Sequence, residues 1–112
     1  MTESTILKGT LDVLVLKTLS WEPMHGVEIT TWLEDRSEGS LAIDDSALYY
    51  ALHRLEERKL VAADWGVTEN NRRARFYRLT PAGREWLKAQ STKFLRYAET
   101  VATVLRTSSR FA

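Results

Sequence analysis

The sequence predicts a mainly α-helical fold that carries one small β-hairpin. Apolar residues recur at helical spacing in three segments between residues 6 and 61. Two short segments between residues 60 and 79 are instead rich in β-branched and aromatic residues, and they flank a polar turn. A last segment, from Thr80 to about Arg106, is helical again and much longer than the others. The predicted order is therefore three helices, two strands and one long helix.

Composition limits the classes of function. The chain has 112 residues, of which 44% are hydrophobic, enough for one domain with one core. Its 16 Lys and Arg against 15 Asp and Glu give a net charge of +1, so any preference for nucleic acid has to be local. Cysteine is absent, and the two histidines, His25 and His53, are far apart in sequence. We therefore expect no disulfide, no metal site and no cofactor.

The sequence also lacks the patterns of secreted, membrane and catalytic proteins. Its first ten residues have no basic-then-apolar signal, and no apolar run approaches the ~20 residues that span a bilayer. No motif places a base beside a nucleophile, and the glycines are too scattered to form a phosphate-binding loop. We expect a soluble, cytoplasmic protein that is not an enzyme.

The first helix is predicted from Ile6 to Ser20, and it is apolar on more than one side. Val13 and Leu16 point away from its main apolar face. A helix of this kind is covered on several sides, and in so small a chain part of the cover can come from a second subunit. The main face consists of Leu7, Leu11, Leu14 and Leu19.

A second helix is predicted from about His25 to Arg36, after a break at Pro23. Gly39 follows it, as a candidate for the left-handed conformation that ends helices. The segment from Leu41 to Ile43 is a short apolar link and a candidate for one β-bridge.

Residues Ile43 to Val61 form a short helix with two different sides. Leu48, Leu52 and Leu55 repeat at i, i+4 and i+7, so they share a side that packs against the other helices. Asp44 or Asp45 is expected to cap the helix start, because a carboxylate there accepts from free backbone N–H groups. The other side presents Ser46, Ala47, Tyr50, His53, Arg54 and Glu57.

The strands are predicted at Leu60 to Trp65, ended by Gly66, and at Ala74 to Leu79, with Asn70 and Asn71 in the turn. This hairpin carries a local cluster of positive charge, although the net charge of the whole chain is only +1. Guanidinium groups on a protruding ribbon suit phosphates and a narrow minor groove. Four arginines fall within seven residues without an intervening acid: Arg72, Arg73, Arg75 and Arg78.

The last helix begins with Thr80 as N-cap and Pro81 at the first helical position. Its 26 or so residues would measure roughly 40 Å, longer than the preceding domain. Much of its apolar stripe would then be exposed in a monomer, which predicts an interface. The stripe consists of Leu87, Phe94, Tyr97, Ala98, Val101, Val104 and Leu105.

Three helices and a two-stranded wing make a winged helix, a variant of the helix-turn-helix. In helix-turn-helix proteins the later helix enters the major groove of DNA, which is about 12 Å wide. Here that recognition helix would be the one within residues 43–61, with the arginine-rich hairpin as the wing.

The same residues resemble the PadR family of transcriptional regulators. The resemblance runs from about Leu7 to Leu105, and it is carried by LYYALHRLEERKLV, ADWG and ENNRRARFYRLTPAG. Its most specific parts are Leu48-Tyr49, Leu52, Arg54-Leu55-Glu56 and Tyr77-Arg78-Leu79-Thr80 with Gly83, and His25-Gly26 matches the turn before the family's second helix.

The resemblance implies a homodimeric repressor on a palindromic operator. Residues 1–80 would form the DNA-binding domain, and residues 81–112 a dimerisation helix that packs on the partner's first helix, all in one structural unit. The resemblance adds Tyr49 and Arg54 as DNA contacts from the recognition helix, and Arg72, Arg73 and Arg75 from the wing. The expected DNA-binding set is Ser46, Ala47, Tyr49, Tyr50, His53, Arg54, Asn71, Arg72, Arg73 and Arg75.

The expected dimer interface joins the first and last helices. Some members of the family sense drugs and hold flat aromatic ligands at the dimer centre, so a small planar aromatic effector that relieves repression is a further expectation. Candidates for its pocket are Leu14, Trp86, Phe94 and Tyr97. The expected interface is Leu7, Leu11, Leu14, Leu87, Phe94, Tyr97, Ala98, Val101 and Leu105.

Several positions depart from the family's pattern. Ser46-Ala47 stands where members often have Gly-Ser or Gly-Thr, Tyr50 where a proline is common, and Lys59 where a glycine is common. These changes leave the fold prediction intact and the operator sequence undetermined. With the two aspartates before the recognition helix, they support an alternative function: a winged-helix protein–protein interaction module without specific DNA binding.

The candidate side chains also have structural interpretations. Tyr49 lies beside the leucine stripe and could pack in the core, His53 could be a solvated helix residue, and Arg54 could pair with Glu57. Wing arginines could form a charged strand edge that opposes aggregation, with Arg78 bracing the strand.

Overall fold

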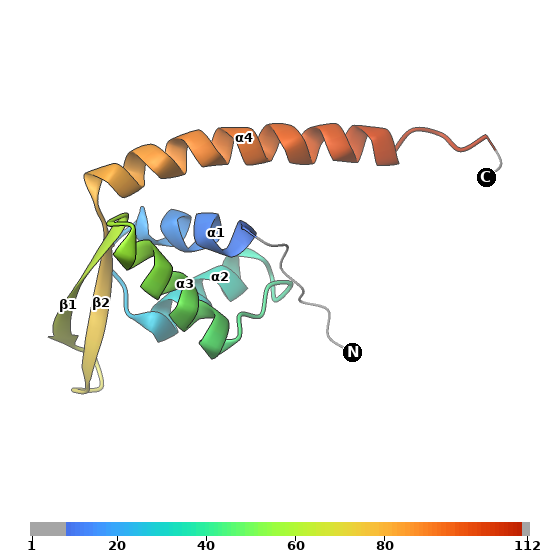
Figure 1. Ribbon diagram of the computed structural model, residues 1–112. Helices are drawn as coiled ribbons and strands as arrows, with labels where there is room; N and C mark the ends of the chain where they lie inside the picture. The colour runs from blue at the N-terminus through green and yellow to red at the C-terminus, as the bar shows by residue number, and fades with distance from the viewer. Residues whose placement is uncertain (1–8, 111–112) are drawn as a thin grey trace.

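The computed structural model describes residues 9–110, and the predicted order of elements is confirmed in them. Figure 1 shows α1, α2 and α3 in one body, with the hairpin along one side and α4 running above α1 and well past it. Leu7, a predicted interface residue, lies outside the described residues. The elements are α1 (Thr10–Leu19), α2 (Gly26–Arg36), α3 (Asp45–Glu57), β1 (Val61–Val67), β2 (Arg73–Leu79) and α4 (Pro81–Leu105).

The core lies between the first three helices, the base of the hairpin and the start of α4. Leu48, Leu52 and Leu55 are buried, so the predicted docking side of α3 is confirmed. The prediction that α1 is covered on more than one side is confirmed. Leu16, expected to point elsewhere, is fully buried together with Val15, whereas the leucines at positions 11 and 14 are only half-buried. The reason is that α1 packs on α2 and α3 on one side and on α4 on the other.

Two predicted helix starts are confirmed in atomic detail. The Asp44 carboxylate accepts from the backbone N–H groups of Ser46 at 3.0 Å and Ala47 at 3.2 Å, as an N-cap of α3. The Thr80 hydroxyl oxygen accepts from the N–H of Gly83 at 2.9 Å, and Pro81 is the first residue of α4.

The hairpin is longer than predicted, because Gly66 does not end the first strand. β1 and β2 pair antiparallel from Val61 opposite Leu79 to Val67 opposite Arg73. A Cβ at position 66 would lie 2.8 Å from the Phe76 ring, so glycine makes room there for a side chain on its own sheet.

The predicted bridge at residues 41–43 was wrong. The isolated bridge joins Met24 to Tyr77. Their backbone groups exchange two hydrogen bonds, of 3.0 and 2.8 Å. The segment before α2 is therefore tied to β2, and the start of α2 lies beside the hairpin.

A tight junction fixes α4 to the end of α3. Lys59 has φ of 63°, in the left-handed region, which turns the chain from α3 into β1. The Thr80 hydroxyl donates toward the carbonyl oxygens of Lys59 at 2.8 Å and Leu60 at 3.0 Å. A Cβ on Gly83 would overlap the Leu60 carbonyl, so only glycine allows α4 to approach this closely.

The shape is elongated because of α4. The principal extents are 59 × 33 × 20 Å and the radius of gyration is 16.3 Å, against about 13 Å for a compact chain of this length. No helix within residues 9–110 has the length and apolar character that crossing a bilayer requires.

Candidate nucleic-acid interface

The outward side of α3 is exposed as predicted. Ser46, Ala47, Tyr50 and His53 all lie at the surface. Tyr49 is 61% exposed, so the interpretation of this side chain as a core residue is wrong. Its ring is parallel to that of His53, with centroids 6.2 Å apart, and meets the Tyr50 ring edge-on at 5.7 Å. The outward side of α3 is thus an aromatic and polar surface.

The hairpin tip carries two exposed arginines. Asn71 has φ of 62° and makes the turn, as the sequence predicted. The Thr68 hydroxyl accepts from the backbone N–H of Arg72 at 3.1 Å, which closes the tip. The Arg73 guanidinium lies over the Trp65 ring, 4.2 Å from its centroid. Among residues 9–110, neither Arg72 nor Arg73 forms an ion pair, so both charges are available to a ligand.

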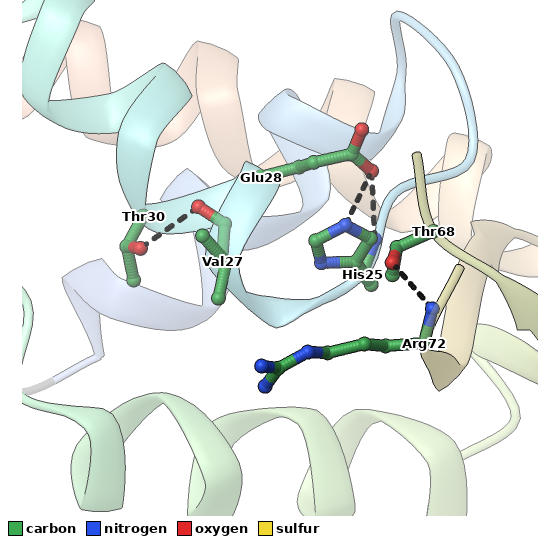
Figure 2. A network of polar contacts seen from close by, with 6 residues as sticks. All are labelled: His25, Val27, Glu28, Thr30, Thr68 and Arg72. Carbon is green, nitrogen blue, oxygen red and sulfur yellow. Dashed lines mark hydrogen bonds and ion pairs between the residues drawn. The ribbon is translucent and has the colours of Figure 1, made fainter. Parts of the chain in front are cut away.

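A hollow of about 470 Å³ separates this tip from the start of α2. Figure 2 shows the Arg72 side chain extending past His25 toward α2. The Glu28 carboxylate accepts from the His25 backbone N–H at 3.1 Å, and the His25 ring meets Phe76 edge-on at 5.2 Å. These contacts hold His25 in place at the start of α2, where it lines the hollow.

A second hollow, of about 380 Å³, lies between α3 and the hairpin. Tyr49 of α3, Trp65 of β1 and Tyr77 of β2 all line it. Burial raises the pKa of the Tyr77 hydroxyl above its ordinary value. The two hollows share His25, Val27 and Ala74, so α2, α3 and the hairpin form one continuous surface.

Three other arginines are held by carboxylates of the chain itself. Arg54 lies 2.7 Å from Asp12 of α1, not beside the predicted partner Glu57, which instead lies 3.4 Å from His53. The remaining pairs are Arg75 with Glu56 at 2.9 Å and Arg78 with Asp64 at 3.3 Å.

The opposite side of the molecule carries the apolar stripe of α4. Leu87 packs in the core and is 8% exposed, so it has little surface for a partner, and Ala98 is half-buried. Beyond Leu87 the helix exposes most of its apolar side chains. Its exposed apolar side chains are Phe94, Leu95, Tyr97, Val101, Val104 and Leu105.

A hollow of about 400 Å³ lies between the start of α1 and α4. Phe94 and Tyr97 line it, whereas Leu14 and Trp86, the other predicted pocket residues, do not. Trp86 is instead covered by the Arg58 guanidinium, 4.7 Å from the ring centroid. The other lining residues are Gly9, Thr10, Val13, Gln90 and Lys93.

Sequence reasoning did not select every residue of the candidate surface. Val27 and Thr68 were missed, because nothing in a local pattern brings the start of α2 to the hairpin tip. Trp65 and His25 lie within stretches that carry the family resemblance, and this was the only signal for them. In residues 9–110, no group of three or more His, Asp or Glu side chains is arranged to hold a metal ion.

Solved structures with the same fold include several regulators. A PadR family transcriptional regulator from Eggerthella lenta is 29% identical, with a TM-score of 0.74 over 90% of this chain and 86% of that one. Regulators from Clostridium thermocellum and Bacillus cereus, each 24% identical with a TM-score of 0.77, share the fold. The match to the Clostridium thermocellum regulator covers 86% of this chain and 93% of that one. The match to the Bacillus cereus regulator covers 91% of this chain and 97% of that one.

The sequence comparisons agree with the fold. An uncharacterized protein of Lysinibacillus sphaericus is 29% identical over 87 residues, which are 78% of this chain and 80% of that protein. The model of the transcriptional regulator PadR-like family matches residues 15–89, which include α2, α3, the hairpin and the start of α4. This match covers more than half of the chain, and the family consists of DNA-binding regulators rather than enzymes. The chain belongs to the PadR-like family of transcriptional regulators.

Proposed function

We propose that the protein is a sequence-specific repressor that inserts α3 into the major groove and holds nearby phosphates with the hairpin tip. One observation supports this above all: α3 and the hairpin tip border two hollows that share His25, Val27 and Ala74, and the two arginines of the tip form no ion pair within residues 9–110. A helix with its side chains fits the major groove, and guanidinium groups at a protruding tip suit phosphates or a narrow minor groove.

The proposed contacts come from two elements. The α3 residues offer hydroxyl, methyl, aromatic and imidazole groups to base edges, and the tip offers an amide and two positive charges. The aspartate before α3, which seemed unfavourable beside a polyanion, is engaged as the N-cap. The contacts are Ser46, Ala47, Tyr49, Tyr50 and His53 from α3, and Asn71, Arg72 and Arg73 from the tip.

We further propose that the protein acts as a homodimer on a palindromic operator. Support comes from the exposed apolar stripe of α4, which is typical of an interface. In a two-fold dimer each subunit would present one α3 and one wing, so the bound DNA would contain two inverted half-sites. Binding to an operator that overlaps a promoter would repress transcription. A protein that acts on chromosomal DNA would work in the cytoplasm.

Control by a small planar aromatic effector is a secondary proposal. The hollow beside Phe94 and Tyr97 favours it, because it combines aromatic walls with a cation at Lys93. Thermal unfolding in the presence of planar aromatic compounds tests it, since a ligand of the folded state raises the melting temperature.

The main experiment is a titration with the DNA directly upstream of the protein's own gene. Binding is measured at several salt concentrations, against scrambled DNA of equal length. Tighter binding to the upstream fragment that persists as salt rises supports a specific regulator, because non-specific phosphate attraction falls steeply with salt. Equal binding to both fragments, and to other genomic fragments, would favour the protein–protein interaction module instead.

A further inference from the structure

Two ion pairs hold α3 from different sides. The Arg54 guanidinium reaches Asp12 on α1, and the Glu56 carboxylate accepts from Arg75 on β2. Residues two positions apart on a helix project about 200° from one another. The two side chains therefore leave α3 in different directions: Arg54 points toward α1, and Glu56 points toward the wing.

The first ion pair joins Arg54 to a largely buried carboxylate, that of Asp12. The Asp12 side chain is only 13% exposed, while Arg54 is 53% exposed. The two are 42 positions apart in sequence, so the 2.7 Å contact joins elements that nothing local connects. A carboxylate with so little access to water is costly to leave unpaired.

The second ion pair joins the wing to α3. Arg75 and Glu56 are both about one-third exposed, at 39% and 33%. The Arg75 guanidinium also lies 5.7 Å from the Tyr77 ring and 6.0 Å from the Trp65 ring. The hydrogen bond to Glu56 raises the pKa of Arg75 above its ordinary value.

These contacts distinguish the two arginines from those at the hairpin tip. To neutralise a phosphate fully, Arg54 or Arg75 would have to share or leave a carboxylate less than 3 Å away. Arg72 and Arg73 have no such competitor within residues 9–110.

We propose that Arg54 and Arg75 are positioning residues: with Asp12 and Glu56 they fix how α3 sits between α1 and the wing, and they do not neutralise DNA phosphates. This inference rests on the proposed DNA-binding function. It makes the placement of α3 against α1 and the wing depend on two carboxylates, of which Glu56 lines a hollow with the proposed DNA contact His53. Both acids therefore help binding, although their charge opposes it.

The sign of an acid-to-amide effect tests this proposal. Full-length Asp12→Asn and Glu56→Gln are titrated with the upstream and scrambled duplexes at several salt concentrations. Loss of a negative charge near DNA should strengthen binding if charge alone matters. Positioning predicts the opposite: each variant binds the upstream duplex about two- to tenfold more weakly, with its salt slope unchanged.

Two matched controls accompany these variants. Glu57→Gln makes the same chemical change at the next position of α3, where the side chain is 68% exposed, and it should not weaken binding. Arg73→Gln removes a charge that no carboxylate holds, and it should lower the salt slope by about one unit. Arg75→Gln should resemble Glu56→Gln and leave the slope near the wild-type value.

A charge exchange, E56R/R75E, covers the case in which the single variants do not fold. It restores an ion pair with unchanged net charge, so cooperative unfolding and the wild-type salt slope are expected. The proposal is overturned if Asp12→Asn and Glu56→Gln bind the upstream duplex as tightly as wild type or more tightly, or if the exchange lowers the slope by about one unit. A wild-type protein that prefers neither the upstream duplex nor any other genomic fragment over scrambled DNA would instead contradict the proposed function itself.

Discussion

Gly83 shows how one missing side chain sets the direction of the longest helix. It lies at the third position of α4, directly against the Leu60 carbonyl, while Thr80 binds the same turn through its hydroxyl. Gly83→Ala should lower the free energy of unfolding by about 2–3 kcal/mol, because the new methyl group overlaps backbone that cannot move cheaply. Urea denaturation measures this change. Ala82→Ser, at an exposed neighbouring position, should stay within about 0.5 kcal/mol of wild type.

Lys59 stands where a glycine is common in the family, and its backbone conformation shows why glycine suits this position. Its φ of 63° is one that side chains other than glycine rarely adopt. Lys59→Gly should therefore leave stability unchanged or raise it by up to about 1 kcal/mol, since relief of the left-handed strain offsets the added freedom of the unfolded chain. A lower denaturation midpoint for this variant would mean that the lysine side chain stabilises the turn.

Residue-level reasoning worked where a pattern was local. The Asp44 and Thr80 caps, and the turn at Asn71, were predicted because each depends on neighbours within three residues. The partner of Arg54 was not, because Asp12 is 42 positions away and any of several acids could have served. The buried side of α1 was also ambiguous, since leucine and valine occur all around that helix.

The hairpin is the element on which the charge argument depends. Its tip carries Arg72 and Arg73, and Figure 1 shows the tip at the end of the hairpin away from α4. Arg73→Ala should weaken binding to upstream and scrambled DNA alike and lower the salt slope by about one unit. Arg84→Ala, the same charge change at the start of α4, should leave the slope unchanged. An unaltered slope in Arg73→Ala would remove the tip from the binding mechanism.

The order and type of the elements could be predicted, but two of their contacts could not. A β-bridge between Met24 and Tyr77 needs only one backbone N–H and one carbonyl from each residue, so it leaves no side-chain pattern. Gly66 looked like a strand end because glycine weakens strands, yet the Phe76 ring occupies the space that it leaves. Both features depend on which segments meet in space.

The whole molecule separates two kinds of surface. Figure 1 places the hairpin tip and α4 on opposite sides of the molecule, and Tyr49 of α3 lines a hollow together with residues of the hairpin. Figure 1 shows α4 running well past α1, and Tyr97, Val104 and Leu105 of its apolar stripe are exposed. A second copy that covers this stripe would leave both DNA-side surfaces open.

Phe94→Asp tests this arrangement at the level of assembly. Wild type should sediment with about twice the chain mass of 12.9 kDa, whereas the variant should sediment as a monomer, because an unpaired carboxylate in an apolar interface is costly. Thr92→Asp adds the same charge about 160° away around α4 and should leave the dimer intact. Phe94 also lines a hollow within its own subunit, so Val104→Asp, farther along the stripe, separates loss of assembly from loss of folding. If both stripe variants remain dimeric, α4 does not form the interface, and the two half-sites would have to be brought together by another surface.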